Sequence, residues 1–383
     1  MGMLNGRSAE AVDRHGIPEE NEAYLNRQII TYIGNKRGLL PFIGAGLSKV
    51  LLRLDRKTIK TFDVFSGSGI VARYLKYYSS KIIANDLEKY SEVINSCYLS
   101  NVSEINTGEL FECYEEISGQ LEEEKLKPGL IARLYAPQDG NVICREDRVF
   151  YTYRNACYID TARDNIEKIP GEYKKYFLAP LLSEASVHSN TSGVFKGFYK
   201  DSKTGIGKFG GNAEEALPRI LGNIVMPFPV FSSFECEYEI LRGDSNAIID
   251  TVEDVDLAYI DPPYNQHPYG SNYFMLNLIV DYAEPRNISS VSGIPDGWNR
   301  SCYNKRACAY SSFRDLVERI KAKFLLISFN SEGFIGHDEI IDLLNRLGKL
   351  EVLETTYNTF RGGRNLRKRN IHVKEYLYLL EKN

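Results

Sequence analysis

The sequence predicts an α/β fold in which a mostly parallel sheet is interrupted by a long insertion. Three observations lead to this prediction. A strand, a glycine-rich turn, a helix, a second strand and a second helix follow one another between residues 59 and 99. Strand and helix patterns resume at residue 257. Between these stretches, from about residue 113 to 238, the periodicity breaks and Gly, Ser and Asn become frequent. Because alternation of strands and helices is typical of parallel sheets, we expect both flanking stretches to belong to one sheet.

The individual elements follow from the local pattern of apolar residues. Residues 1–20 are expected to form a leader, and helical spacing runs from Glu22 to about Tyr32. Strands are predicted over 59–65 and 81–84, and helices over 70–78 and 88–99. The later elements are a strand over 257–260, a helix over 311–322, a strand over 324–329, a helix over 338–347 and two closing strands over 350–357 and 372–380.

The composition narrows the class of protein without giving a function. Of the 383 residues, 43% are hydrophobic and 26% are charged, which excludes wholesale disorder. No run of about 18 apolar residues occurs and the first residues lack a signal-peptide pattern, so we expect a cytoplasmic protein without membrane contact. The net charge of −4 leaves nucleic-acid binding to local basic surfaces. The seven cysteines include no Cys-x-x-Cys pair, and no metal site is expected.

A glycine-rich turn joins the first strand to its helix. Gly67 and Gly69 follow Phe65, and glycines at such a turn let the backbone approach a ligand while the helix N-terminus offers free N–H groups. The turn is neither Gly-x-Gly-x-x-Gly nor a P-loop, which disfavours a nicotinamide cofactor or ATP. Asp63 before the turn suits an ammonium group, and Asp86 after the next strand suits ribose hydroxyls. Alone, the turn is equally compatible with a structural role.

The segment Asp261-Pro-Pro-Tyr264 directly follows an apolar strand. The prolines end the strand, fix the backbone and hold the Asp261 carboxylate and the Pro262 carbonyl as two neighbouring acceptors. Tyr264 adds a flat apolar face, on which a base would stack with about 1–3 kcal/mol. Two acceptors beside an aromatic ring suit the exocyclic amine of a base flipped out of a duplex. The alternative is a proline turn in which Asp261 is only a cap, and the upstream glycine turn argues against it.

Together these motifs resemble the D12 class of DNA adenine-N6 methyltransferases, which use S-adenosylmethionine and carry their motifs in the α order. The extension over 265–273 is similar to methylases of FokI-like, type IIS restriction systems. Gly44 and Gly46 are additions to the family pattern, and without a preceding strand we do not interpret them as a second nucleotide loop. The matching stretches are 32–43 for the N-terminal cofactor motif, 63–69 for the glycine motif, 85–86, 242–244, 261–264 for the catalytic motif, and 324–330 for a later strand.

The resemblance implies a Rossmann-like class I methyltransferase sheet with an inserted target-recognition domain. The implied division is a leader (1–20), the first part of the catalytic domain (21–112), the target-recognition domain (113–238) and the second part of the catalytic domain (239–383). Asp261, Pro262 and Tyr264 would be catalytic, with S-adenosylhomocysteine as the second product of methyl transfer to adenine N6. The implied cofactor-binding residues are Tyr32, Lys36, Asp63, Phe65, Gly67, Gly69, Asp86 and Asp244.

Double-stranded DNA is the partner that the resemblance implies. A cognate restriction endonuclease acting on the same site is a further expected partner. We expect the protein itself to be a monomer. The densest basic run offers phosphate contacts from Arg361, Arg364, Arg367, Lys368 and Arg369, or it is a solvated turn. The loop over 189–200, with Lys196 and Lys200, either reads base edges or is an ordinary flexible loop. Arg154 and Arg163 are further candidates, and Tyr357 or Phe360 either stacks on the flipped base or packs in the core.

Three other functions compete with this interpretation. A cytosine-N4 methyltransferase faces the same chemistry but more often resembles a Ser-Pro-Pro-Tyr pattern, so Asp261 favours adenine. A protein glutamine methyltransferase would more typically resemble Asn-Pro-Pro-Tyr. A DNA-binding module without catalysis belongs to a different class, and the intact Asp261 and glycine turn argue against it.

Overall fold

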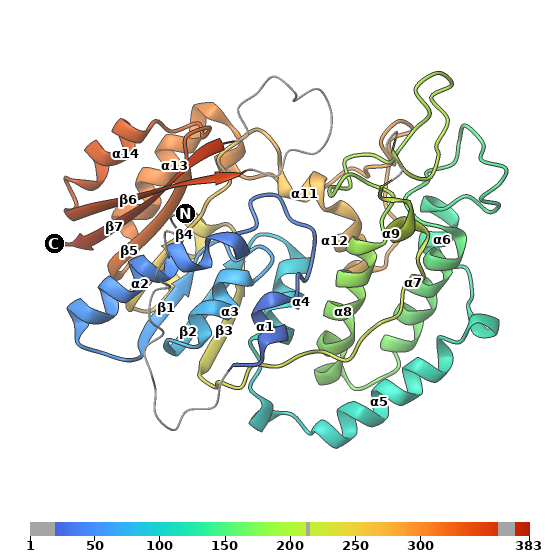
Figure 1. Ribbon diagram of the computed structural model, residues 1–383, viewed down its shortest axis with the longest axis horizontal. Coiled ribbons are helices and arrows are strands. Elements are labelled where there is room, and N and C mark those ends of the chain that lie inside the picture. Colours follow the sequence, from blue (N-terminus) through green and yellow to red (C-terminus); the bar gives the residue numbers. More distant parts are fainter. Residues whose placement is uncertain (1–19, 212–214, 359–371) are drawn as a thin grey trace, which may run out of the picture.

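A seven-stranded mixed sheet forms one end of the molecule in the computed structural model, which describes residues 20–211, 215–358 and 372–383 (Figure 1). The sheet confirms the predicted Rossmann-like α/β fold. Only β7 runs against its neighbours, since it pairs antiparallel with both β5 and β6. In spatial order the strands are β3 (Glu237–Arg242), β2 (Ser79–Asp86), β1 (Ile59–Asp63), β4 (Val255–Ile260), β5 (Ala322–Asn330), β7 (His372–Lys382) and β6 (Gly348–Asn358).

The register of the parallel strands brings four chain segments to one edge of the sheet. Asp63 at the end of β1 pairs with Tyr259 of β4 and with Ala84 of β2, and Asp86 pairs with Arg242 of β3. The segments that follow these strands therefore emerge side by side. In open α/β sheets, ligands bind outside the carboxyl ends of the strands, so this edge is where a site is expected.

Helices cover both faces of the sheet. On one face, α2 (Leu40–Leu54) and α3 (Ile70–Lys76) share a core with the strands; on the other, α13 (Arg306–Arg319) and α14 (His337–Leu344) do so. Gly44 and Gly46 lie within α2, where a Cβ on Gly44 would stand 2.3 Å from the Tyr74 hydroxyl and one on Gly46 2.7 Å from Leu326. These two glycines let α2 pack closely, in agreement with our reading that they are not a nucleotide loop.

The region between β2 and β3 is helical and lies on the opposite side of the molecule from β6 and β7 (Figure 1). Its buried residues, those of α4 included, form one continuous core with α1 and α12, so the helical region does not have a core of its own. The helices in and beside it are α1 (Glu22–Asn26), α4 (Lys89–Tyr98), α5 (Thr107–Gln120), α6 (Leu130–Tyr135), α7 (Tyr153–Ile166), α8 (Lys174–Val187), α9 (Leu217–Leu221) and α12 (Phe274–Asp281).

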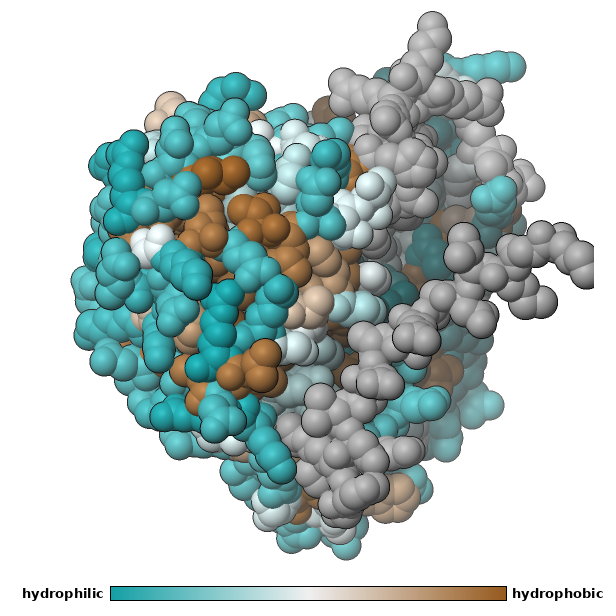
Figure 2. Space-filling model, turned by 60° about the vertical axis from the view of Figure 1, so that its left-hand side comes forward, coloured by the Kyte–Doolittle hydropathy of each residue, from teal (hydrophilic) through white to brown (hydrophobic). Residues whose placement is uncertain are grey.

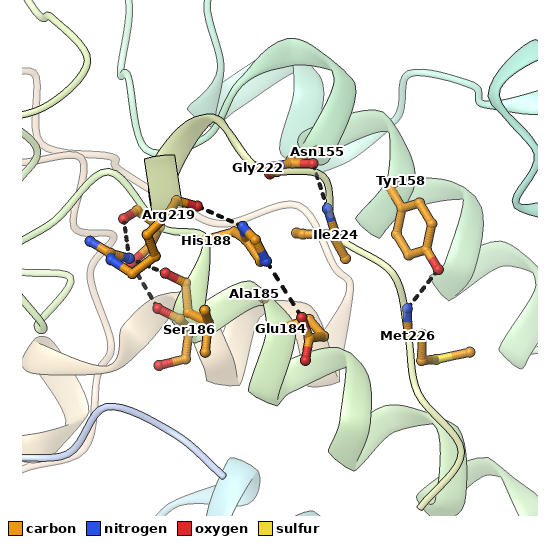
Figure 3. A network of polar contacts seen from close by, with 12 residues as sticks. Asn155, Tyr158, Glu184, Ala185, Ser186, His188, Arg219, Gly222, Ile224 and Met226 are labelled. Carbon is orange, nitrogen blue, oxygen red and sulfur yellow. Dashed lines mark hydrogen bonds and ion pairs between the residues drawn. The ribbon is translucent and has the colours of Figure 1, made fainter. Parts of the chain in front are cut away.

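The segment that leaves the helical region is fastened to α7 and α8 by polar contacts (Figure 3). Asn155 of α7 accepts from the Ile224 N–H at 2.9 Å and donates to the Gly222 carbonyl at 2.8 Å. The Tyr158 hydroxyl accepts from the Met226 N–H, and His188, at the end of α8, bonds the Arg219 carbonyl at 2.7 Å. Side chains thus satisfy backbone groups that no regular ladder reaches.

The predicted elements flanking the insertion are all present, with ends shifted by a few residues. Outside the insertion, the helices α2 and α12 and the edge strand β3 lacked a prediction, as did the short helices α10 (Ser245–Ile248) and α11 (Tyr269–Asn272). Figure 2 shows the side carrying α2 and β6 as mainly hydrophilic around a band of apolar side chains. Among the described residues, no helix is long and apolar enough to span a membrane.

Candidate active site

A cavity of about 670 Å³, including the space at its open mouth, lies at the carboxyl edge of the sheet. Residues from distant segments meet there, because the register of β1 to β4 aligns the ends of these strands. Five predicted site residues line it: Tyr32, Phe65, Asp86, Asp244 and Asp261.

The glycine turn after β1 is held in place by Asp86. The Gly67 N–H donates to Asp86 Oδ2 at 2.8 Å, and the Glu88 N–H donates to Oδ1 at 2.9 Å. Gly67 has φ +52°, and a Cβ there would lie 2.8 Å from a ring carbon of Tyr32. Gly69 has φ +74° at the N-terminus of α3. The turn therefore requires glycine for its backbone conformation and because Tyr32 is so close.

One wall of the cavity carries three carboxyl groups. Asp86 ends β2, Glu88 comes two residues later, and Asp244 follows β3, where it also caps α10 by accepting from the Asn246 N–H at 3.0 Å. Burial raises the pKa of Asp86 to about 6 and, together with the neighbouring Asp86, that of Glu88 to about 7. The main cause in both groups is burial, which disfavours the charged form of a carboxyl group.

The charge of the cavity limits what can bind. Four of its lining residues are acidic, counting Asp261, and among the described residues none of those that line it is Lys, Arg or His. A phosphate-bearing cofactor would meet only like charge. A nucleoside that carries positive charge and no phosphate fits both the carboxylates and the aromatic rings of Tyr32 and Phe65. These residues therefore suit a cationic, phosphate-free nucleoside.

A stack of tyrosines supports the cavity from the side of the helical region. Tyr32 is stacked on Tyr269 at 5.0 Å and on Tyr273 at 4.9 Å between ring centroids. The Tyr32 backbone segment is fixed as well, because the Ile33 N–H donates to the Tyr273 hydroxyl and the Ile33 carbonyl accepts from the Tyr269 hydroxyl. The rings thus hold the N-terminal motif against the extension that follows Tyr264.

The opposite wall carries Asp261 with a lysine. The Lys36 ammonium is 3.2 Å from Asp261 Oδ1, an ion pair that is not aligned as a hydrogen bond, and Lys36 is 3% exposed. Burial lowers the pKa of Lys36, but Asp261, Tyr264 and Glu375 outweigh it and hold the pKa well above its usual value. Burial raises the pKa of Asp261 to about 6, although Lys36 opposes this rise. Lys36 is not among the residues that line the cavity.

The remaining catalytic-motif residues frame Asp261. Pro262 is buried, and the Tyr264 ring lies beneath the Lys36 ammonium, 5.6 Å from nitrogen to centroid. The Tyr264 carbonyl accepts from the Phe334 N–H at 3.0 Å, which ties the motif to the loop after β5. The Asp261 carboxyl group is thereby held beside the Tyr264 ring at the carboxyl end of β4.

Asp63 lies under the glycine turn and not on the cavity wall. Its side chain is 1% exposed, and both oxygens lack an aligned hydrogen bond among the described residues. Burial, with Asp261 and Asp86 nearby, raises the pKa of Asp63 well above its usual range; the amides of Phe65 and Ala72 oppose this rise only in part. An orphaned buried carboxyl of this kind is what a nearby ammonium would compensate.

The predicted DNA contacts in the helical region fall into two groups. The Lys196 ammonium lies 3.5 Å from His267, which follows the catalytic motif, and Lys200 donates to the Val291 carbonyl at 2.8 Å. By contrast, Arg154 is bonded to Glu123 at 2.9 Å, and Arg163 is 3% exposed and bonded to Glu167. The basic run of Arg361, Arg364, Arg367, Lys368 and Arg369 lies outside the described residues, as do Phe360 and the side chain of Tyr357.

Several lining residues had no sequence prediction. Glu88 could have been found from its position two residues after Asp86. Gly270 lies within the extension that resembles type IIS methylases, but nothing marked it individually. No sequence signal identified Asn299, Ser301 and Asn304, because they come from a loop without a motif. Within the described ranges, no group of three His, Cys, Asp or Glu side chains is arranged to hold a metal ion.

Comparison with known proteins gives matches over most of the chain. The family model "D12 class N6 adenine-specific DNA methyltransferase" matches residues 32–304. Type II methyltransferase M.CviAII of Paramecium bursaria Chlorella virus 1 is 30% identical, with 93% of this chain and 99% of the relative covered. M.NlaIII of Neisseria lactamica is 28% identical over 92% of this chain and 99% of its own. M.FokI of Planomicrobium okeanokoites is 26% identical over 92% of this chain, which spans 52% of that longer protein.

Proposed function

Because the chain belongs to the D12 class of N6 adenine-specific DNA methyltransferases, we propose that the two walls of its cavity bind the methyl donor and the target adenine side by side. The observation that carries this assignment is the single cavity lined by Asp86 and Asp244 on one side and by Asp261 on the other. A donor and an acceptor held in one cavity is the geometric requirement for direct transfer.

S-adenosylmethionine is the methyl donor that we propose for the acidic wall. It is a phosphate-free nucleoside with a sulfonium and an ammonium, which suits a cavity with four carboxyl groups and no lining cation among the described residues. Asp244 would accept from the adenine amino group of the donor and Asp86 from its ribose, while Tyr32 and Phe65 provide apolar contact. Asp63, buried under the turn, would act on the ammonium indirectly, through the amides of the turn.

The chemistry proposed for the chain is positioning and charge stabilisation. When bound, S-adenosylmethionine supplies a methyl group that its positive sulfur makes electrophilic. The Asp261 carboxylate and the Pro262 carbonyl would accept hydrogen bonds from the N6 amine, which directs the nitrogen lone pair toward that methyl. Tyr264 would stack on the flipped base. Lys36 would keep Asp261 ionised in its buried position, since an isolated buried carboxylate binds a proton.

The helical region is proposed to contact DNA. Residues 113–238, the stretch predicted as the target-recognition domain, contain Lys196 and Lys200, and Lys196 reaches His267 beside the catalytic motif. A duplex placed over the cavity mouth would therefore meet the ammonium group of Lys196. The similarity to type II methyltransferases supports a role as the modification enzyme of a restriction system, with an endonuclease that acts on the same site.

The test is a methylation assay with mapped products. Duplex DNA is incubated with the protein and S-adenosylmethionine, and the modified nucleosides are identified and located in the sequence. N6-methyladenine at one recurring sequence is the expected result, with no product from Asp261→Ala. N4-methylcytosine would instead support the cytosine alternative, and no modified base on any duplex would contradict the proposal.

A further inference from the structure

Glu88 is a buried carboxylate in the cavity to which the proposed mechanism gives no task. It directly precedes α4, its side chain is 2% exposed, and it lines the cavity next to Asp86. The side-chain amides of Asn277 and Asn299 both donate to its Oε2, at 2.5 and 3.1 Å. No described residue donates a hydrogen bond to Oε1. One oxygen is thus held by two amides from distant segments while the other is left without a partner.

Gly270 keeps the free oxygen accessible. A Cβ on Gly270 would lie 3.1 Å from Glu88 Oε1, and 2.5 Å from the Asn299 carbonyl oxygen. Without a side chain at this position, the loop carrying Asn299 comes close enough for its amide to reach Glu88, and Oε1 is not covered. Gly270 and Asn299 also line the cavity, so the free oxygen belongs to the cavity wall.

A purely structural role does not account for this arrangement. Holding two amides explains only Oε2; the other oxygen, Oε1, lies on the wall of the cavity without a described donor, where a hydrogen-bond donor of a ligand can reach it. Two amide donors could be satisfied equally well by a neutral acceptor. Burial and the adjacent Asp86 raise the pKa of Glu88 to about 7, which shows that the cost of burial falls on the ionised form. A hydrogen-bond donor on a ligand would reduce that cost.

We infer that Glu88 Oε1 accepts a hydrogen bond from a ribose hydroxyl of the methyl donor. Asp86, whose two oxygens each already accept one backbone N–H, from Gly67 or from Glu88, would take the other hydroxyl. Both carboxylates lie at or just after the end of β2, between the Asp244 side and the Asp261 side of the cavity, where the ribose of the donor would lie. This inference rests on the proposed function, which assigns the cavity to S-adenosylmethionine.

A ligand-variant cycle tests it. Calorimetry measures binding of S-adenosylhomocysteine and of its 2′-deoxy and 3′-deoxy analogues to the full-length protein and to Glu88→Ala. We expect Glu88→Ala to weaken the binding of S-adenosylhomocysteine by about ten- to a hundredfold, which is the effect of losing one hydrogen bond to a charged acceptor. The analogue that lacks the hydroxyl bound by Glu88 should bind the variant and the unaltered protein equally well. Glu92→Ala is the matched control, since Glu92 lies in the first turn of α4, which Glu88 precedes, and its half-exposed side chain is 3.5 Å from Arg242.

The outcomes separate this inference from the function on which it rests. Equal weakening of all three ligands would mean that Glu88 only holds Asn277 and Asn299 in place, and unchanged affinity would mean that it does not touch the ligand; either result overturns the inference. Failure of the unaltered protein to bind S-adenosylhomocysteine would overturn the proposed function as well. If Glu88→Ala does not fold, Glu88→Gln keeps the size of the side chain, and the same selective pattern with a smaller loss is expected.

Discussion

The two walls of the cavity treat their carboxyl groups differently. On the wall of β2 and β3, Asp86, Glu88 and Asp244 have amide partners, and no Lys, Arg or His among the described residues lines the cavity beside them. Burial raises the pKa of Asp86, and likewise that of Asp261 on the other wall, to about 6, and that of Glu88 to about 7. On the wall of β4, Asp261 has Lys36 at 3.2 Å. The carboxyl groups of the first wall thus lack a positively charged partner among the described residues, whereas Asp261 is paired with Lys36.

The ligands that we propose for the two walls would account for the difference. S-adenosylmethionine carries positive charge, so acids on its wall gain their counter-charge when it binds. The target adenine is neutral, and its amine can only donate hydrogen bonds to Asp261. The protein itself must therefore supply the cation that keeps Asp261 ionised.

Asp261→Ala should separate the two walls most sharply. We expect methyl transfer to fall by about a thousandfold or more, in line with the loss of a preorganised group at the reacting atom. Binding of S-adenosylhomocysteine should change little, because Asp86 and Asp244 remain. Single-turnover methylation and calorimetry measure the two effects. An alanine variant that methylates duplex DNA at a near-normal rate would remove Asp261 from the mechanism.

Lys36→Met should move the pH dependence of catalysis. The pKa of Asp261 is about 6 with Lys36 beside it, so activity should rise with pH through about 6 as the carboxylate forms. Without the ammonium the pKa rises by about one to three units, and the midpoint should shift upward by a similar amount. Activity at neutral pH then falls and partly recovers at higher pH.

The control for this prediction is Lys49→Met. Lys49 also pairs with an acid, Glu351, but its side chain is 43% exposed and it lies away from the cavity. Its profile should match that of the unaltered protein. An unshifted midpoint in Lys36→Met would show that Lys36 does not set the ionisation of Asp261, and the contrast between the walls would lose its functional meaning.

The sequence was most informative where a residue's role depends on its neighbours in the chain. The order of strand, glycine turn and acid fixes Gly67, Asp86 and Asp261 at strand ends, and parallel strands bring such ends to one edge. The sheet was therefore predictable, as were five of the residues that line the cavity. The assigned roles of these residues stay predictions until they are tested.

What the sequence did not indicate depends on contacts between distant segments. The pair of Lys36 and Asp261 joins residues 225 positions apart, and Glu88 meets Asn277 and Asn299 only after the chain has folded. The helix α2 was missed because glycines disfavour helices in isolation, whereas here they permit close packing. The shared core of the helical region likewise has no local signature, because it includes α4 and α12 from outside the insertion.

Gly67→Ala should weaken binding of the methyl donor and leave Asp261 in place. The added Cβ is strained at φ +52° and would meet Tyr32 at 2.8 Å, so either the turn or the tyrosine must move. We expect about a tenfold loss of affinity for S-adenosylhomocysteine, measured by calorimetry. Gly119→Ala is the control, because a Cβ at that position meets nothing within 4 Å. Equal affinities of both variants would show that the glycine turn does not shape the donor site.

The smallest effect is expected outside both walls of the cavity, where lysine side chains would contact the phosphates of DNA. The cavity is lined by acids, so phosphates should be contacted by lysines beyond its mouth, among them Lys196 and Lys200. Replacing both with alanine should lower the slope of log affinity against log salt by about 0.9 for each phosphate contact that is lost. The loss should be similar for cognate and unrelated duplexes, because phosphates carry no sequence information.

Lys60→Ala is a control, since Lys60 pairs with Glu253 at 2.7 Å and does not line the cavity. An unchanged slope would place the DNA contacts elsewhere, whereas a loss confined to the cognate duplex would mean that these lysines read base edges.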